Sequence, residues 1–200
     1  MKPSFSHPFA ERTNIKPEEI LTLPYGSFRG RIMVVEKPAD VKKAITHISK
    51  ESLLGFDTET RPSFKKGQVF KVAMLQLATA DQAWLFRLHH TGFPPELKEL
   101  LSDQHTTKCG VAIRDDLKAL QKIEPFEPGG FIELAALSKQ KGLEVEGLRK
   151  LAAILLGIRI SKSAQTTNWE SRILTGKQVE YAATDAWACL EIYRRLLDRP

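Results

Sequence analysis

The pattern of apolar and polar positions changes at about residue 30. Before that point prolines interrupt every apolar run, and only one short helix is expected, over 17–23, where Pro17 suits a first turn. From Gly30 onward apolar residues recur with the spacing of regular secondary structure. We therefore expect an N-terminal arm over 1–29 and a single folded domain over 30–200.

Within the domain, strand patterns come early and helix patterns come late. Segments rich in β-branched and aromatic residues predict strands at 31–35, 53–59, 69–79, 83–87 and 107–111. Helical spacing predicts helices at 39–49, 95–101, 113–122, 132–141, 148–156 and 178–197. This order predicts an α/β fold in which helices cover a mixed sheet.

Charge and composition narrow the class of protein. The 200 residues carry 30 Lys and Arg against 24 Asp and Glu, a net charge of +6, which favours polyanionic partners such as nucleic acid. A solvated lysine-rich face would give the same balance. No apolar run reaches the roughly 18 residues of a membrane span, and the N-terminus has no leader-like apolar run. We expect a cytoplasmic protein that does not enter membranes.

Cysteine and histidine give no sign of a metal site. Cys109 and Cys189 lie far apart in apolar segments, as expected for reduced core thiols rather than a disulfide or a zinc site. The five histidines lack metal-ligand spacing, and His89 and His90 are expected to form a loop pair.

Two acidic residues share one face of a predicted strand. Asp57 and Glu59 are separated by one residue, so the alternation of a strand points both carboxylates the same way. The apolar run before them is typical of a central strand. The pair is a candidate functional site, with a solvated strand end as the alternative.

The helix expected at 113–122 places one aspartate close to the core. Ile113, Leu117 and Leu120 define its apolar stripe; Asp116 falls beside that stripe, whereas Asp115 falls nearly opposite. A carboxylate at a core edge is costly unless a counter-charge or a metal ion accepts it. Asp116 is therefore a candidate ligand, and a salt bridge to Lys or Arg is the alternative.

On the last predicted helix, Tyr181 and Asp185 stand four residues apart and therefore share a face. Asp185 lies on the flank of the buried stripe, away from bulk water. A structural hydrogen bond between the two side chains is the alternative to a functional pair.

Together these positions predict four carboxylates that converge: Asp57, Glu59, Asp116 and Asp185. Charges about 6 Å apart repel by about 3 kcal/mol per pair at an effective dielectric constant of about 20. Two divalent cations would cancel the four charges. Hard oxygen ligands select Mg²⁺ or Mn²⁺ over zinc.

The order of these motifs resembles that of a known superfamily. The motifs are Phe56-Asp57-Thr58-Glu59, the run from Lys108 to Asp116, and Tyr181-Ala-Ala-Thr-Asp185, with further agreement at Leu75-Gln76-Leu77 and from Lys162 to Trp169. They resemble the three motifs of the DEDD 3′-5′ exonucleases, tyrosine subgroup (DEDDy), which includes ribonuclease D and the exonuclease domain of the Werner-syndrome helicase.

The resemblance implies an RNase H-like fold, with a mixed five-stranded sheet flanked by helices. It further implies that Asp57, Glu59 and Asp185 hold one divalent cation, and that Asp57 and Asp116 hold a second. Tyr181 would orient the attacking water, and the products would be nucleoside 5′-monophosphates released from a DNA or RNA 3′ end. The expected substrate contacts are Thr58, Gln76, Arg114 and Lys162; for the two basic residues, a solvated surface charge is the alternative. A catalytically inactive nucleic-acid-binding module on the same fold is the alternative.

Overall fold

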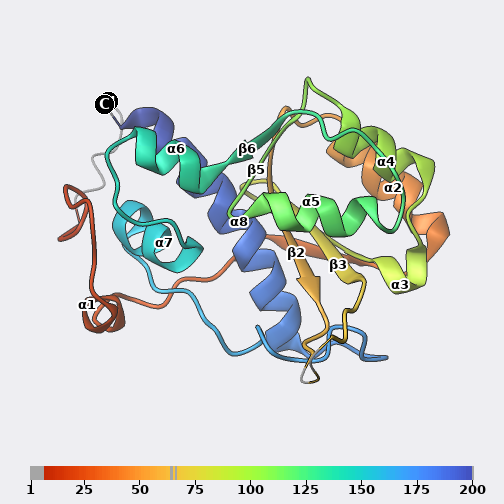
Figure 1. Cartoon of the computed structure of the whole chain (residues 1–200), viewed down its shortest axis with the longest axis horizontal. Coiled ribbons are helices and arrows are strands. Elements are labelled where there is room, and N and C mark those ends of the chain that lie inside the picture. The colour runs from red at the N-terminus through yellow and green to blue at the C-terminus, as the bar shows by residue number, and fades with distance from the viewer. Residues whose placement is uncertain (1–6, 64, 66, 200) are drawn as a thin grey trace.

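A six-stranded mixed sheet forms the centre of the protein (Figure 1). The structure is a computed structural model that describes residues 7–63, 65 and 67–199. The sheet order is β1-β4-β3-β2-β5-β6, and β3 runs antiparallel to its neighbours β2 and β4, whereas the other neighbouring pairs are parallel. The strands are β1 (Arg31–Val35), β2 (Leu53–Thr60), β3 (Val72–Ala78), β4 (Gln82–Arg87), β5 (Thr107–Gly110) and β6 (Phe131–Glu133). The expected α/β fold with a mixed sheet is confirmed.

The sheet has one strand more than the sequence predicts. Residues 131–133 pair with β5 in parallel before the chain turns into α6 (Leu134–Gln140), where the sequence predicts a helix from residue 132. Three residues are too few for strand alternation to be distinguished from helical spacing. β3 also begins at Val72 rather than 69, because Val69 lies in the preceding loop with 83% of its surface exposed.

Helices cover both faces of the sheet. Phe56, Leu75 and Leu77 pack on one face with apolar residues of α2, α4 and α5. Met74, Ala78 and Leu85 pack on the other face against α8, which crosses the sheet in Figure 1. The helices are α1 (Pro17–Leu21), α2 (Pro38–Ile48), α3 (Leu88–Thr91), α4 (Pro95–Ser102), α5 (Ile113–Gln121), α6, α7 (Leu148–Leu156) and α8 (Gly176–Asp198). His89 and His90 therefore lie in a short helix, not in a loop.

The sheet and α8 approach each other closely at a glycine. A Cβ atom added to Gly55 would lie 1.8 Å from the carbonyl oxygen of Ala186, so no other residue fits there without moving the helix. Ala182, Ala183 and Ala186 are fully buried on the same helix. Small residues on both sides thus let α8 lie directly against β2.

The described part of the N-terminal arm packs onto the domain. Phe9, Ile15, Ile20 and Leu23 are buried in one apolar cluster with residues of α7 and α8, and the arm contains the short helix α1. A domain boundary at residue 29 stays a prediction, and the first six residues of the arm lie outside the described residues.

Both cysteines are buried free thiols, as expected. Across the described ranges, no helix is long and apolar enough to span a membrane.

Candidate active site

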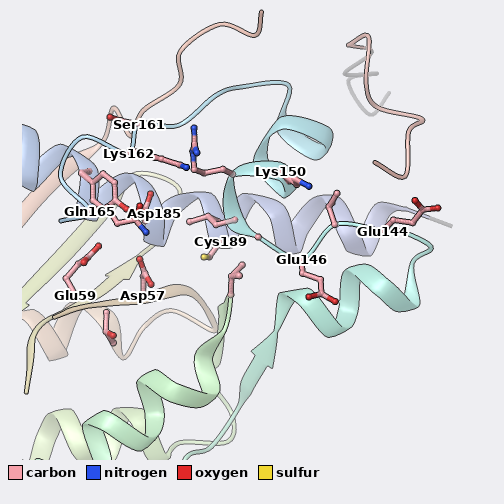
Figure 2. A pocket seen from close by; sticks show the side chains of 17 residues that line it. Asp57, Glu59, Glu144, Glu146, Lys150, Ser161, Lys162, Gln165, Asp185 and Cys189 are labelled. Carbon is pink, nitrogen blue, oxygen red and sulfur yellow. The ribbon is translucent and has the colours of Figure 1, made fainter. Parts of the chain in front are cut away.

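Three carboxylates meet where β2 faces α8. Asp57 and Glu59 point from β2 toward α8, and Asp185 points back from the helix (Figure 2). One ligand oxygen from each of the three lies within 4.8 Å of the others. We call these three residues the carboxylate cluster. It arises because strand alternation puts Asp57 and Glu59 on the α8 face, and because Gly55 lets α8 approach closely.

The cluster carries like charges in a largely buried environment. Burial first, and then the neighbouring carboxylates, raise the pKa of Asp57 well above its usual value. The same causes raise the pKa of Glu59 to about 9. Burial also raises the pKa of Asp185 to about 7, although the hydrogen bond from Tyr181 and the charge of Arg149 act in the opposite direction. Within the part of the chain that the structure describes, the cluster forms no ion pair with Lys or Arg.

Asp116 reaches the site from the other face of β2. Thr58, whose side chain alternates with those of Asp57 and Glu59, donates a hydrogen bond of 2.6 Å from Oγ1 to Oδ1 of Asp116. Burial is the main cause that raises the pKa of Asp116 to about 6. The charge of Asp116 raises the pKa of both Asp57 and Glu59. Asp116 is thus coupled to the cluster electrostatically, but it lies outside the group of three.

Tyr181 lies one helical turn before Asp185 and is 9% exposed. Its phenol donates a hydrogen bond to the Asp185 carboxylate. Its ring packs against that of the buried Trp169, with 6.0 Å between the two ring centroids. Burial and the nearby carboxylates raise the pKa of Tyr181. The phenol therefore stays protonated at neutral pH and can act as a fixed hydrogen-bond donor.

A cavity of about 700 Å³ opens from the cluster toward the start of α7. Its wall has basic and acidic side chains as well as the cluster (Figure 2). The lining residues are Asp57, Thr58, Glu59, Val111, Glu144, Val145, Glu146, Gly147, Leu148, Arg149, Lys150, Ser161, Lys162, Gln165, Tyr181, Asp185 and Cys189. The cavity is large enough for a nucleotide-sized ligand.

The structure brings only two of the four expected substrate contacts to this cavity, Thr58 and Lys162. Gln76 is fully buried on β3 opposite Asp57, and its side-chain amide has no hydrogen-bond partner among the described residues. Arg114 is exposed on α5, outside the cavity. Arg149 also lines the cavity. It is not among the expected substrate contacts, because nothing in the sequence distinguishes it from the other basic residues.

Comparison with known proteins identifies a family for this chain. Residues 32–199 match the model of a 3′-5′ exonuclease domain family. The mouse bifunctional 3′-5′ exonuclease/ATP-dependent helicase WRN is 34% identical over 87% of this chain, which spans 13% of that protein. A 3′-5′ exonuclease of Arabidopsis thaliana is 30% identical over 88% of this chain and 67% of its own length.

Solved structures share the fold. The Nibbler EXO domain of Aedes aegypti superimposes with a TM-score of 0.79 at 23% identity, covering 87% of this chain and 92% of that one. RNase D of Escherichia coli gives a TM-score of 0.76 at 23% identity, over 84% of this chain and 45% of that one. On the match to the family model over residues 32–199, this chain belongs to the 3′-5′ exonuclease domain family.

Proposed function

We propose that this protein is a metal-dependent 3′-5′ exonuclease that hydrolyses phosphodiester bonds at the 3′ end of DNA or RNA and releases nucleoside 5′-monophosphates. The observation that carries the proposal is the carboxylate cluster, in which three acidic groups lie within 4.8 Å of one another beside a cavity. Buried like charges are costly without a cationic partner. In a member of the exonuclease family, a bound cation would serve the hydrolysis of a phosphodiester bond.

The donor atoms of the site suit divalent cations. Carboxylate oxygens are hard ligands, which Mg²⁺ and Mn²⁺ prefer. We assign one cation to Asp57, Glu59 and Asp185. We assign a second to Asp57 and Asp116, because Asp116 is hydrogen-bonded to Thr58 of β2, the residue next to Asp57. When bound, two such cations supply charge neutralisation, an acidified water nucleophile and stabilisation of the leaving oxygen.

The protein's own side chains would position the reactants. The Tyr181 phenol, held against Trp169, would orient the attacking water through a hydrogen bond. Lys162 and Arg149, on the cavity wall, would contact substrate phosphates, and the guanidinium of Arg149 is near enough to Asp185 to lower its pKa. The excess of basic residues would bring the polyanion to the cavity.

An inactive nucleic-acid-binding module on the same fold is the rival function. Such a module would need the fold and the basic residues but not the carboxylate cluster. The repulsion within the cluster would then destabilise the module and contribute nothing to its function. The observed cluster therefore favours the enzyme.

The direct test is an assay with 5′-end-labelled single-stranded and recessed-duplex DNA and RNA in Mg²⁺ or Mn²⁺. The proposal expects a ladder that shortens from the 3′ terminus and is absent in Asp57→Asn. No shortening of any of these substrates would refute the proposed activity. Binding without hydrolysis would support the rival module.

The phosphate contacts have a separate test in EDTA, where the substrate stays intact. Each of Lys162→Ala and Arg149→Ala is expected to weaken single-strand binding and to reduce the slope of log K against log[salt] by about 0.7. An unchanged slope would show that the residue does not contact phosphate.

A further inference from the structure

We propose that Glu133 is a positioning residue that holds Asp116 in place by accepting hydrogen bonds from the first amides of α5. The inference rests on the proposed function, because it assigns Asp116 a part in binding the cation. Glu133 is the last residue of β6 and lies outside both the carboxylate cluster and the cavity wall.

The Glu133 carboxylate connects three elements through backbone amides. Its Oε1 accepts from the Ala112 amide at 3.0 Å, and its Oε2 accepts from the Ile113 amide at 2.9 Å. Oε1 also accepts from the Ala135 amide at 3.1 Å, in the first turn of α6. One side chain at the end of β6 thus fixes where both α5 and α6 begin.

The start of α5 needs such a partner. The first amides of a helix have no acceptor within the helix, and Ala112, which precedes α5, has no side-chain oxygen to cap them. Ala112 also has φ 59° and ψ 30°, and it is the one non-glycine residue with positive φ in the described parts of the chain. Such a conformation persists where surrounding contacts hold it. The carboxylate of Glu133, at the end of β6, accepts the hydrogen bonds that a capping side chain at position 112 would otherwise accept.

The position of this turn determines the position of Asp116. Asp116 lies in the first turn of α5, three residues after Ile113, and accepts the 2.6 Å hydrogen bond from Thr58. Thr58 stands between Asp57 and Glu59 on β2. A shift of the helix start would therefore move Asp116 relative to the cluster, although Glu133 touches no residue of the cluster.

The test compares Glu133→Gln with Glu127→Gln. Gln keeps the shape of Glu133, but its NH₂ group replaces one carboxylate oxygen. One backbone N–H that donates to Glu133 in the wild type would then face another donor. Glu127 is exposed in the same segment and provides a control for the same chemical change. The quantities to measure are the Mn²⁺ concentration for half-maximal thermal stabilisation, and kcat and KM on a single-stranded oligonucleotide.

For Glu133→Gln we expect the Mn²⁺ half-saturation concentration to rise and kcat to fall, each by about 10- to 100-fold, as is typical when a group that orients a metal ligand is lost. KM should stay within about twofold, because the phosphate contacts are unchanged. Glu127→Gln should match the wild type. Wild-type values of half-saturation and kcat in Glu133→Gln would overturn the proposal.

Loss of stability alone is separated from loss of position by a second variant. Ala112→Gly removes the left-handed strain, so the double variant Ala112→Gly/Glu133→Gln should fold even if Glu133→Gln does not. We expect the folded double variant to keep its weakened Mn²⁺ affinity. If its affinity returns to the wild-type value, Glu133 only stabilises the fold and the proposal fails.

Failure of the proposed function gives a different result. A wild-type protein that binds Mn²⁺ but hydrolyses nothing would refute the nuclease, while the Mn²⁺ titrations would still decide the role of Glu133. A wild-type protein that binds no divalent cation would refute both.

Discussion

Two ionisable groups lie at the same end of the sheet, one strand apart, and the protein treats them differently. Glu59 on β2 pairs with Met74 on β3, which pairs in turn with Arg87 on β4. The fully buried Arg87 donates to Glu36 at 2.5 Å and to the carbonyl oxygens of Ser171 and Arg172. The carboxylate cluster has no such cationic partner among the described residues.

The difference indicates what each charge is for. Arg87 is compensated within the chain and ties the segment before α8 to β4, so its role is structural. The cluster keeps most of its repulsion, because the nearby charge of Arg149 only partly offsets it, and a bound cation would relieve the rest. Four predictions test this contrast, beginning with the largest expected effect.

Removing one carboxylate should end activity without harming the fold. Asp57→Asn is expected to lower kcat by about 10³-fold or more, about 4 kcal/mol in the activation barrier. Its metal-free form should be at least as stable as the wild type, because a repelled buried charge is gone. Hydrolysis assays and urea unfolding in EDTA measure the two quantities. A destabilised Asp57→Asn would contradict the view that the cluster is strained.

Removing the compensated charge should do the reverse. Arg87→Leu is expected to lower the free energy of unfolding by about 3 kcal/mol, since it leaves buried carbonyls without donors and breaks the pair with Glu36. Arg31→Leu, at an exposed position of β1, is the control and should change stability by less than about 0.5 kcal/mol. Equal effects of the two substitutions in urea unfolding would show that Arg87 is not a structural anchor.

The metal-free protein should lose stability as the pH rises. The pKa values of Glu59 and Asp185 are about 9 and about 7 in the folded chain, against ordinary values of 4.5 and 3.8 for these side chains. Between these limits the folded chain binds more protons than the unfolded chain, so the free energy of unfolding falls with increasing pH.

Added Mg²⁺ should offset this loss, most strongly above pH 7, by binding the deprotonated folded state. Urea unfolding from pH 5.5 to 8.5, in EDTA and in Mg²⁺, tests both statements. Stability that rises with pH in EDTA would contradict the assigned pKa shifts. Asp185→Asn should show a weaker pH dependence than the wild type.

The smallest effects concern the basic residues. Lys162→Ala, on the cavity wall, is expected to raise KM by about fivefold, about 1 kcal/mol. Arg114→Ala, outside the cavity, should leave KM within about twofold of the wild type. If Arg114→Ala has the larger effect, the substrate follows a path other than the cavity.

Much of this arrangement could be predicted from local sequence patterns. Alternation places Asp57 and Glu59 on one face of a strand, and helical spacing places Tyr181 and Asp185 together. These rules concern one element at a time. They explain why most helices and strands were predicted to within a few residues, and why the three-residue β6 was not.

Relations between elements were harder to predict. The sequence suggested that Asp116 faces the core side of its helix, but not that it meets Thr58 on the opposite face of β2 from the cluster. It gave no reason to choose Arg149 or Glu133 among many charged residues, because their partners lie on other elements. Gln76 and Arg114 were expected substrate contacts because of the family resemblance and their place beside the motifs. In the structure, neither residue lines the cavity.

The backbone contact at Gly55 sets a hard limit on the width of the site. Since a single added carbon would collide with the Ala186 carbonyl, the distance between helix and strand depends on main-chain atoms rather than on adjustable side chains. A library randomised at codon 55 and selected for activity should therefore return glycine alone, whereas neighbouring codons should accept several alternatives.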